Sequence, residues 1–201
     1  KTNHKTLLEG QYSLPEFEYL KDNEWIFTEK VDGTNIRVMF DGKEITFGGK
    51  TDNAQILAFL VNRLTEKFVT QIDAFLQKFG IDGNVCLYGE GYGAKIQGCG
   101  GNYRKDQDFV LFDVKVGEWW LKREDIHEVA KTFNLDIVPI IGSGSLKTMV
   151  EMTRAGFNSI WGNFKAEGIV ARPAVELKAR DGSRIITKIK YKDFAHDRLT
   201  D

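Results

Sequence analysis

Two Asp-Gly pairs constrain the fold of the first quarter of the chain more strongly than any other feature. They are Asp32-Gly33 and Asp41-Gly42, and they separate three short runs rich in β-branched and aromatic residues, at 25–27, 36–40 and 45–47. An Asp-Gly pair between two such runs is a strong hairpin signal, because glycine reaches the positive φ angles that a tight turn needs. The sequence therefore predicts two consecutive β-hairpins and an antiparallel sheet.

The hydrophobic period changes after this region. Between Asn53 and Phe79, large apolar residues recur at intervals of three and four, which predicts an amphipathic helix or a broken pair of helices that Gly80 ends. Further predicted elements are strands at 85–88 and 109–112 with a glycine-rich loop at 89–101 between them, a helix at 122–133, a strand at 137–141, a short helix capped by Ser145, and strands at 168–172 and 184–191. We expect an α+β fold of antiparallel sheets flanked by helices.

Charge and cysteine content limit the possible partners and compartments. The formal net charge of −1 does not indicate a nucleic-acid binder, but residues 172–192 hold seven Lys and Arg against two acidic residues. Such a run is usually a solvated face, with a nucleic-acid contact as the alternative. Cys86 and Cys99 lack metal-ligand spacing and fit free thiols in a reducing cytosol. No apolar run approaches the roughly 18 residues of a membrane span, so we expect a soluble, cytoplasmic protein with no membrane partner.

Lys30 is the main candidate for chemistry, within Glu29-Lys30-Val31-Asp32-Gly33-Thr34-Asn35. A lysine attacks phosphorus only as the neutral amine, which nearby cations and partial desolvation favour. Lys188 and Lys190 are spaced by one residue, so they lie on one face of the predicted strand. That face is able to hold nucleotide phosphates, or it is an ordinary polar strand face.

Three further residues are ambiguous when each is taken alone. Glu90 ends a strand before a glycine-rich turn, where a carboxylate is able to bind ribose hydroxyls. Glu167 begins a strand, and a carboxylate near a triphosphate indicates a hydrated divalent ion. Phe112 suits either stacking on a purine or core packing.

The order of these segments is more specific than any one of them. The chain carries Lys-x-Asp-Gly-Thr-Asn, Leu-Tyr-Gly-Glu, Phe-Val-Leu-Phe-Asp-Val, Glu-Gly-Ile-Val and Lys-Ile-Lys in that order between residues 29 and 192. This order resembles motifs I, III, IIIa, IV and V of the covalent nucleotidyltransferase superfamily of ATP-dependent ligases and capping enzymes. Asn35 in place of the arginine typical of DNA ligases, Ile96-Gln97, and Arg172-Pro173 resemble the nick-sealing RNA ligase 2 type.

The resemblance implies an ATP-grasp-like nucleotidyltransferase domain, with residues 1–201 as a single adenylyltransferase domain and no C-terminal accessory domain in this chain. Either a natural minimal enzyme or a catalytic domain on its own fits that length. The resemblance also implies a role for each matching residue. Lys30 forms the lysyl–AMP bond, Asn35 and Glu90 contact the ribose or the sugar ends, Phe112 stacks on adenine, Glu29 lies where backbone contacts to the base are made, Glu167 organises Mg²⁺ or Mn²⁺ through water, and Lys188 and Lys190 hold phosphates. Lys50 stands where an arginine is usual, so it keeps the charge and loses bidentate phosphate geometry.

The expected function is ATP-dependent joining of RNA 5′-phosphate and 3′-hydroxyl ends, above all in a nicked duplex, by a monomer. Phage- and virus-encoded proteins are among the expected sources. RNA contact is expected at residues 172–192 and at exposed loops such as 100–104. The alternatives are the catalytic core of a DNA ligase, a GTP-dependent capping enzyme, and a non-catalytic RNA-binding homologue.

Overall fold

The computed structural model describes residues 7–195, and the chain forms two compact units. The first unit combines Lys1–Val31 with Pro139–Asp201, and the second is Asp32–Val138. Each unit has its own sheet and its own hydrophobic core. The predicted α+β class is confirmed, and within the described residues only the pairing of β5 with β7 is parallel.

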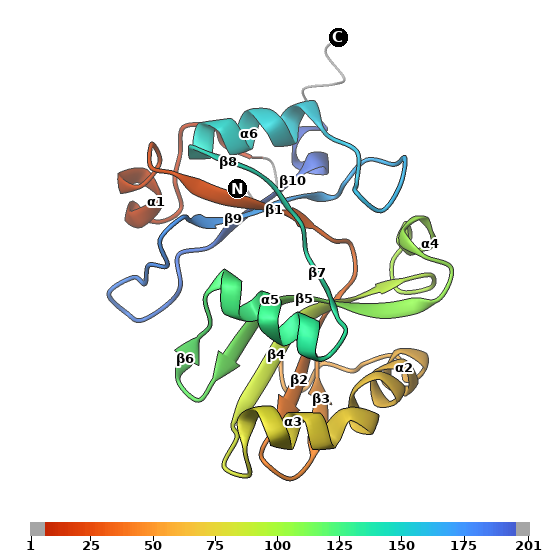
Figure 1. Cartoon of the computed structure of the whole chain (residues 1–201). Helices are drawn as coiled ribbons and strands as arrows, with labels where there is room; N and C mark the ends of the chain where they lie inside the picture. Colours follow the sequence, from red (N-terminus) through yellow and green to blue (C-terminus); the bar gives the residue numbers. More distant parts are fainter. Residues whose placement is uncertain (1–6, 196–201) are drawn as a thin grey trace. The chain divides into compact units, whose positions relative to one another are not determined.

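The first unit is a four-stranded antiparallel sheet in the order β10-β9-β1-β8, with α6 lying along it (Figure 1). Its elements are α1 (Pro15–Tyr19), β1 (Trp25–Lys30), β8 (Ile140–Gly144), α6 (Leu146–Ala155), β9 (Gly168–Pro173), β10 (Thr187–Lys190) and a 3₁₀ turn η2 (Tyr191–Phe194). Leu146 and Met149 of α6 join Trp25 and Phe27 of β1 in a buried cluster. Ser145 caps α6 by accepting a hydrogen bond from the Thr148 N–H at 3.2 Å, as predicted.

The second unit has a sheet in the order β3-β2-β4-β5-β6, to which β7 is added beside β5. Its elements are β2 (Thr34–Phe40), β3 (Ile45–Gly48), α2 (Ala58–Phe68), a 3₁₀ turn η1 (Val69–Gln71), α3 (Ile72–Phe79), β4 (Val85–Gly93), α4 (Gly100–Tyr103), β5 (Gln107–Val116), β6 (Trp119–Trp120), α5 (Arg123–Thr132) and β7 (Asp136–Ile137). The predicted broken helix pair is therefore confirmed as α2 and α3.

Alternation along the strands sends one face of this second sheet into the core. Ile36, Val38 and Phe40 of β2 are buried in a cluster with apolar residues of α2, α3 and α5. Phe75 of α3 stacks on Phe133 after α5 with ring centroids 4.1 Å apart. Three helices thus cover this face. Because side chains alternate along a strand, the odd-numbered residues of β2 point to the opposite face of the sheet.

The prediction of two consecutive hairpins is half right. β2 and β3 form a hairpin around Asp41-Gly42, but β1 pairs with β8 and β9, and β2 pairs with β3 and β4. The Asp32-Gly33 turn therefore carries the chain from one sheet to the other. A Cβ atom at Gly33 would lie 2.2 Å from the carbonyl oxygen of Gly91, so close backbone packing explains this glycine.

Three other predicted boundaries are wrong. The glycine-rich stretch predicted as loop from residue 89 is strand as far as Gly93, because glycines there allow close packing: a Cβ at Gly89 would lie 2.2 Å from the Phe109 ring. The strand predicted at 137–141 is two strands in different sheets, β7 and β8, separated by Pro139, which has no N–H to donate to a ladder. The strand predicted at 184–191 is regular only from Thr187 to Lys190.

Two absences hold for the part of the chain that the structure describes. Within residues 7–195, no helix is long and apolar enough to cross a membrane. Cys86 and Cys99 are both free thiols, with no disulfide among the described residues.

Candidate nucleotide-binding and catalytic site

Lys30 is the last residue of β1, and three adjacent strands bring three of the four predicted catalytic residues of the first unit together: Lys30, Glu167 and Lys190, without Lys188. Lys30 is in register with Gly168 of β9, and Gly168 is in register with Lys190 of β10. Glu167 immediately precedes Gly168. Residues from three segments that are distant in sequence thus meet at one end of the sheet.

Glu167 is hydrogen-bonded to both lysines. The Lys30 Nζ lies 2.6 Å from Glu167 Oε2, and the Lys190 Nζ lies 2.5 Å from Glu167 Oε1. The Lys30 and Glu167 side chains are only 14% and 11% exposed, so this ion pair is largely shielded from water. One carboxylate between two ammonium groups leaves a net positive charge, which suits an anionic ligand such as a phosphate.

Gly168 allows this arrangement because β9 and β10 approach closely there. A Cβ at residue 168 would lie 2.1 Å from the Ile189 carbonyl oxygen and 2.8 Å from the Lys190 Cα. The Tyr191 N–H also donates to the Glu167 carbonyl oxygen at 2.8 Å. A side chain at 168 would therefore push β10, and with it Lys190, away from Glu167.

Glu29 points away from Lys30 and is 1% exposed. Its Oε2 accepts a hydrogen bond from the Ile160 N–H at 3.1 Å, so the carboxylate holds the turn that precedes Glu167. Burial raises the pKa of Glu29, and hydrogen bonds from Ser159 and the Ile160 N–H oppose that rise. The resemblance assigned backbone contacts to this position, and its side chain has a structural partner in the same unit.

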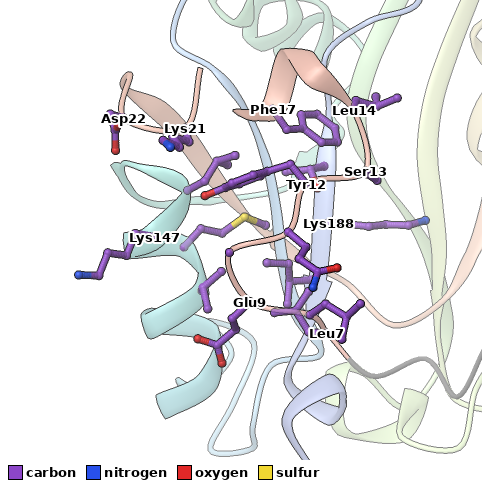
Figure 2. Close-up of a pocket in the computed structure, with 18 of the residues that line it drawn as sticks. Leu7, Glu9, Tyr12, Ser13, Leu14, Phe17, Lys21, Asp22, Lys147 and Lys188 are labelled. Carbon is purple, nitrogen blue, oxygen red and sulfur yellow. The ribbon is translucent and has the colours of Figure 1, made fainter. Parts of the chain in front are cut away.

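Lys188 borders a cavity of about 720 Å³ in the first unit (Figure 2). The lining is mainly apolar and comes from residues 7–22, α6 and β10, with Tyr12, Phe17 and Met149 among its members. Figure 2 shows the Lys188 ammonium directed away from the other lining side chains. Lys188 is the only predicted site residue in this cavity, so the cavity is distinct from the cluster around Glu167.

The second unit holds the residues whose side chains are predicted to contact the base and the ribose. Asn35 of β2 and Glu90 of β4 are directly opposite each other in the antiparallel ladder, so both point away from the helix-covered core. Tyr88 pairs with Asp113 and Gly89 pairs with Leu111, which leaves Phe112 without a partner at a β-bulge. Bulges redirect side chains and are common beside active sites, and Phe112 is half-buried outside the core cluster.

Lys50 lies in an exposed loop just after β3, and Arg37 fixes that loop. The Arg37 Nε donates to the Gly49 carbonyl oxygen at 2.8 Å, and its Nη2 lies 2.7 Å from Asp52 Oδ1. The sequence reading missed Arg37. Its spacing of two residues from Asn35 on a strand was the available signal, since it places both on one face.

Residues 100–104 were predicted to be an exposed loop, and that prediction is wrong. Gly100 and Tyr103 are buried in α4, and the Tyr103 hydroxyl accepts a hydrogen bond from the Asp32 N–H at 3.1 Å. The Gln97 Nε2 donates to the Gly33 carbonyl oxygen at 3.1 Å. The segment between β4 and β5 therefore packs on the turn after Lys30, a role that its glycine-rich composition does not reveal.

The residues do not form a direct metal site. Among residues 7–195, no group of three or more His, Cys, Asp or Glu side chains is arranged to hold a metal ion. Both oxygens of Glu167, the predicted metal residue, are engaged by ammonium groups. Direct coordination of a divalent ion by Glu167 therefore does not fit this arrangement.

The fold is that of a nucleotidyltransferase domain of RNA ligases. An apo mutant of the Naegleria gruberi RNA ligase matches with a TM-score of 0.68 at 23% identity, over 92% of this chain and 54% of that one. A mutant of the same enzyme with ATP and Mn matches with a TM-score of 0.68 at 22% identity, over 93% and 54%. The enzyme with PPi matches with a TM-score of 0.68 at 21% identity, over 100% and 63%.

The family follows from the sequence itself. A family model described as RNA ligase matches residues 23–191. The chain therefore belongs to the RNA ligase family, whose members are ATP-dependent nucleotidyltransferases. It spans 54% to 63% of the length of these three Naegleria structures. The search of curated proteins gave no match.

Proposed function

We propose that this chain is an ATP-dependent RNA ligase domain that joins RNA ends through a covalent lysyl–AMP intermediate on Lys30. The observation that carries the proposal is the pairing of Lys30 and Lys190 with the two oxygens of Glu167, at 2.6 Å and 2.5 Å. The proposal is supported by the family membership, since the matched region contains all three residues.

The first step needs a neutral Lys30. Its Nζ lone pair attacks the α-phosphorus of ATP, the N–P bond forms, and the bond to pyrophosphate breaks. Glu167 orients the amine and accepts its hydrogen bond, while Lys190 pairs with the other carboxylate oxygen of Glu167. Lys188 and Lys190 bind phosphate oxygens, because phosphoryl transfer depends mainly on positioning and charge neutralisation.

The second unit supplies the side-chain contacts to the nucleoside. Phe112 stacks on adenine, and the pair of Asn35 and Glu90 binds the ribose hydroxyls or the sugar ends of the substrate. Backbone atoms at Glu29 contact the base. Lys50 contributes a single charge to phosphate binding. It lies between Gly49 and Asp52, the two loop residues that Arg37 contacts.

The second and third steps transfer and then release AMP. An oxygen of an RNA 5′-phosphate attacks the phosphorus of lysyl–AMP, which regenerates the Lys30 amine and gives an adenylylated end. The 3′-hydroxyl of the other strand then attacks the 5′-phosphate, loses its proton and expels AMP. The domain acts as a monomer on RNA 5′-phosphate and 3′-hydroxyl ends, with a nicked duplex as the preferred substrate.

Mg²⁺ or Mn²⁺ accompanies ATP in this proposal. Mutant Naegleria structures with ATP or AMP and Mn support the choice of ion. Glu167 would hold the ion through water, and the positive charge of the ion would add to the neutralisation of the triphosphate.

Labelling with α-labelled ATP tests the proposal. We expect wild type to retain label after denaturation and Lys30→Ala to retain none, because no other group replaces the amine. Lys43→Ala, which removes an exposed lysine at the turn between β2 and β3, should label like wild type. Persistent labelling of Lys30→Ala would disprove the assignment, and labelling by GTP instead of ATP would indicate a capping enzyme.

Sealing assays then separate RNA from DNA ligation. Nicked duplexes with RNA or DNA on the 3′-hydroxyl side should show preferential sealing of the RNA nick. Equal or better sealing of DNA would favour the DNA ligase alternative, and a wild-type protein that forms no adduct would favour a non-catalytic RNA-binding homologue.

A further inference from the structure

We infer that Tyr103 is a positioning residue for the adenylylation of Lys30. Its hydroxyl oxygen accepts a hydrogen bond from the Asp32 N–H at 3.1 Å, two residues after the nucleophile. On the other side of the same turn, Gln97 Nε2 donates to the Gly33 carbonyl oxygen at 3.1 Å. The inference rests on the proposed function, because it concerns the geometry of the attack by Lys30.

The turn at residues 31–33 needs such support. β1 and β2 belong to different sheets, so no ladder of backbone hydrogen bonds joins the two strands across the turn. Gly33 packs directly on the backbone of Gly91, and the contacts from Tyr103 and Gln97 complete the attachment. Val31 alone separates Lys30 from Asp32 in the chain, and in-line attack loses rate steeply with displacements of about 1 Å.

Tyr103 is itself held firmly. It is 7% exposed, and its ring meets the buried Tyr92 ring edge-on at 86°, with centroids 6.0 Å apart. A Cβ at Gly100 would lie 1.9 Å from the Gly93 carbonyl oxygen, so the start of α4 is packed against the end of β4. The hydroxyl of Tyr103 therefore has little freedom to follow a moving turn.

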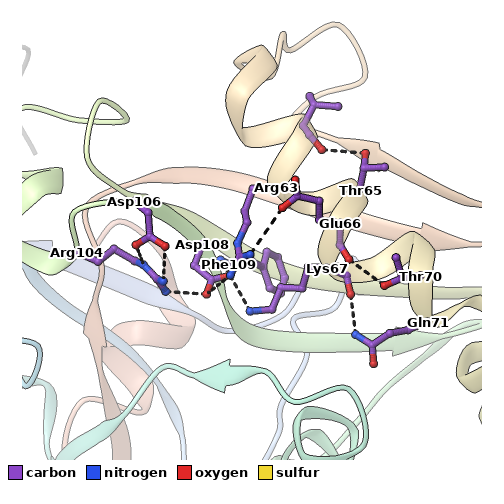
Figure 3. Close-up of polar contacts among 11 residues, drawn as sticks. Arg63, Thr65, Glu66, Lys67, Thr70, Gln71, Arg104, Asp106, Asp108 and Phe109 are labelled. Carbon is purple, nitrogen blue, oxygen red and sulfur yellow. Dashed lines mark hydrogen bonds and ion pairs between the residues drawn. The ribbon is translucent and has the colours of Figure 1, made fainter.

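Arg104 fixes the end of α4 (Figure 3). Its Nε and Nη2 lie 2.6 Å and 2.9 Å from the two carboxylate oxygens of Asp106, and its Nη1 lies 2.6 Å from Asp108 Oδ2. The guanidinium also sits 5.8 Å from the centre of the Tyr92 ring. The hydrogen bond to Asp106 is the main cause of the raised pKa of Arg104.

Asp108 joins this segment to α2 and β5. It is 4% exposed, and its Oδ1 accepts hydrogen bonds from Lys67 Nζ at 2.7 Å and from the Phe109 N–H at 2.9 Å. Burial alone would raise the pKa of Asp108, but these hydrogen bonds and the charges of Lys67 and Arg104 hold it below the usual value. Through Arg104 and Asp108, the segment that carries Tyr103 is therefore tied to α2, which packs on the core.

Removing only the Tyr103 hydroxyl separates positioning from folding. Tyr103→Phe keeps the buried ring and its contact with Tyr92 but leaves the Asp32 N–H without its acceptor. Because the hydroxyl lies on the turn and not among the residues proposed to hold ATP, the maximal rate of adduct formation should fall and the ATP concentration for half-maximal rate should stay the same. Tyr19→Phe is the matched control, since Tyr19 is 86% exposed in the other unit.

The experiment measures both the contact and the chemistry in the full chain. We expect the Asp32 amide of Tyr103→Phe to exchange with solvent at least about fivefold faster by NMR, and the maximal rate of AMP adduct formation to fall about tenfold, the scale of one lost hydrogen bond. Arg104→Lys keeps the charge but loses the bidentate grip on Asp106, so it should give the same pattern more weakly. It also serves as the test if Tyr103→Phe does not fold.

A wild-type rate of adduct formation in folded Tyr103→Phe would overturn the inference, and so would a higher ATP requirement at an unchanged maximal rate. Both outcomes differ from failure of the proposed function, in which the wild-type protein itself would form no adduct. If the wild-type protein forms no adduct but the Asp32 amide of Tyr103→Phe still exchanges faster, the Tyr103 contact has a structural role only.

Discussion

Glu29 and Lys30 are consecutive on β1 and point into opposite environments. Lys30 reaches Glu167, whereas Glu29 is buried against the turn at Ser159 and Ile160. The alternation of a strand produces this division, so the residue next to the proposed nucleophile holds the backbone that leads to Glu167. The Lys-x-Asp-Gly-x-Asn pattern identified the lysine, but it carries no information about what the neighbouring carboxylate contacts.

Glu29→Gln tests the cost of burying that carboxylate. The folded state holds the Glu29 proton more tightly than the unfolded state, because burial raises its pKa. The free energy of unfolding that Glu29 contributes therefore falls as pH rises from about 4.3, the ordinary glutamate pKa, through the raised pKa, and is constant above it. We expect the stability of Glu29→Gln relative to wild type to increase over that window, by about 1.4 kcal/mol for each unit of the rise.

Urea unfolding at several pH values measures this difference. Glu18→Gln, at an exposed position in the same unit, should follow wild type at every pH. A difference between Glu29→Gln and wild type that does not change with pH would contradict the argument.

At the scale of elements, the first unit's site depends on how closely β9 and β10 approach at Gly168. Gly168→Ala should lower the free energy of unfolding by about 1–3 kcal/mol, the usual range for overpacking, and should slow adduct formation by moving Lys190 away from Glu167. Denaturant unfolding and the labelling rate test the two effects. Gly142→Ala in β8 is the control, because its new Cβ would be 3.7 Å from Phe27. A Gly168→Ala variant with wild-type stability and rate would show that β10 adapts without consequence.

Local patterns predicted the elements better than their partners. Hydrophobic spacing predicted α2, α3 and α5, and the Ser145 cap predicted α6, because these depend on residues close in sequence. The pairing of β1 with β9 joins residues more than 130 positions apart, so no local pattern reveals it. The Asp32-Gly33 turn therefore predicted a hairpin of β1 with β2 that does not form. The contact between Lys30 and Glu167 has the same non-local origin: the five ordered motifs assigned both residues to one site through resemblance, but they did not predict this contact.

At the scale of the whole molecule, a net charge of −1 requires that RNA binding rest on a local positive surface. Within the basic stretch, Lys190 is paired with Glu167, and the Arg184 Nε lies 2.5 Å from Glu176 Oε1. Lys178 and Arg180 are exposed on the segment between β9 and β10. Lys188 and Lys192 are exposed as well, but Lys188 is proposed to hold ATP phosphates, so Lys178 and Arg180 are the pair chosen to test RNA contact.

Replacing both Lys178 and Arg180 with alanine should weaken binding to a nicked RNA duplex at low salt and lower the slope of log affinity against log salt by about 1.4–1.8, since each phosphate contact contributes about 0.7–0.9. Fluorescence anisotropy between low and moderate salt measures both quantities. A double variant of the exposed Lys43 and Lys131 removes the same charge from the second unit and should leave the slope unchanged. If both double variants lose the same affinity, the effect is one of net charge and the segment between β9 and β10 does not contact RNA. If only the Lys178 and Arg180 variant changes, RNA lies on the first unit, which also holds Lys30.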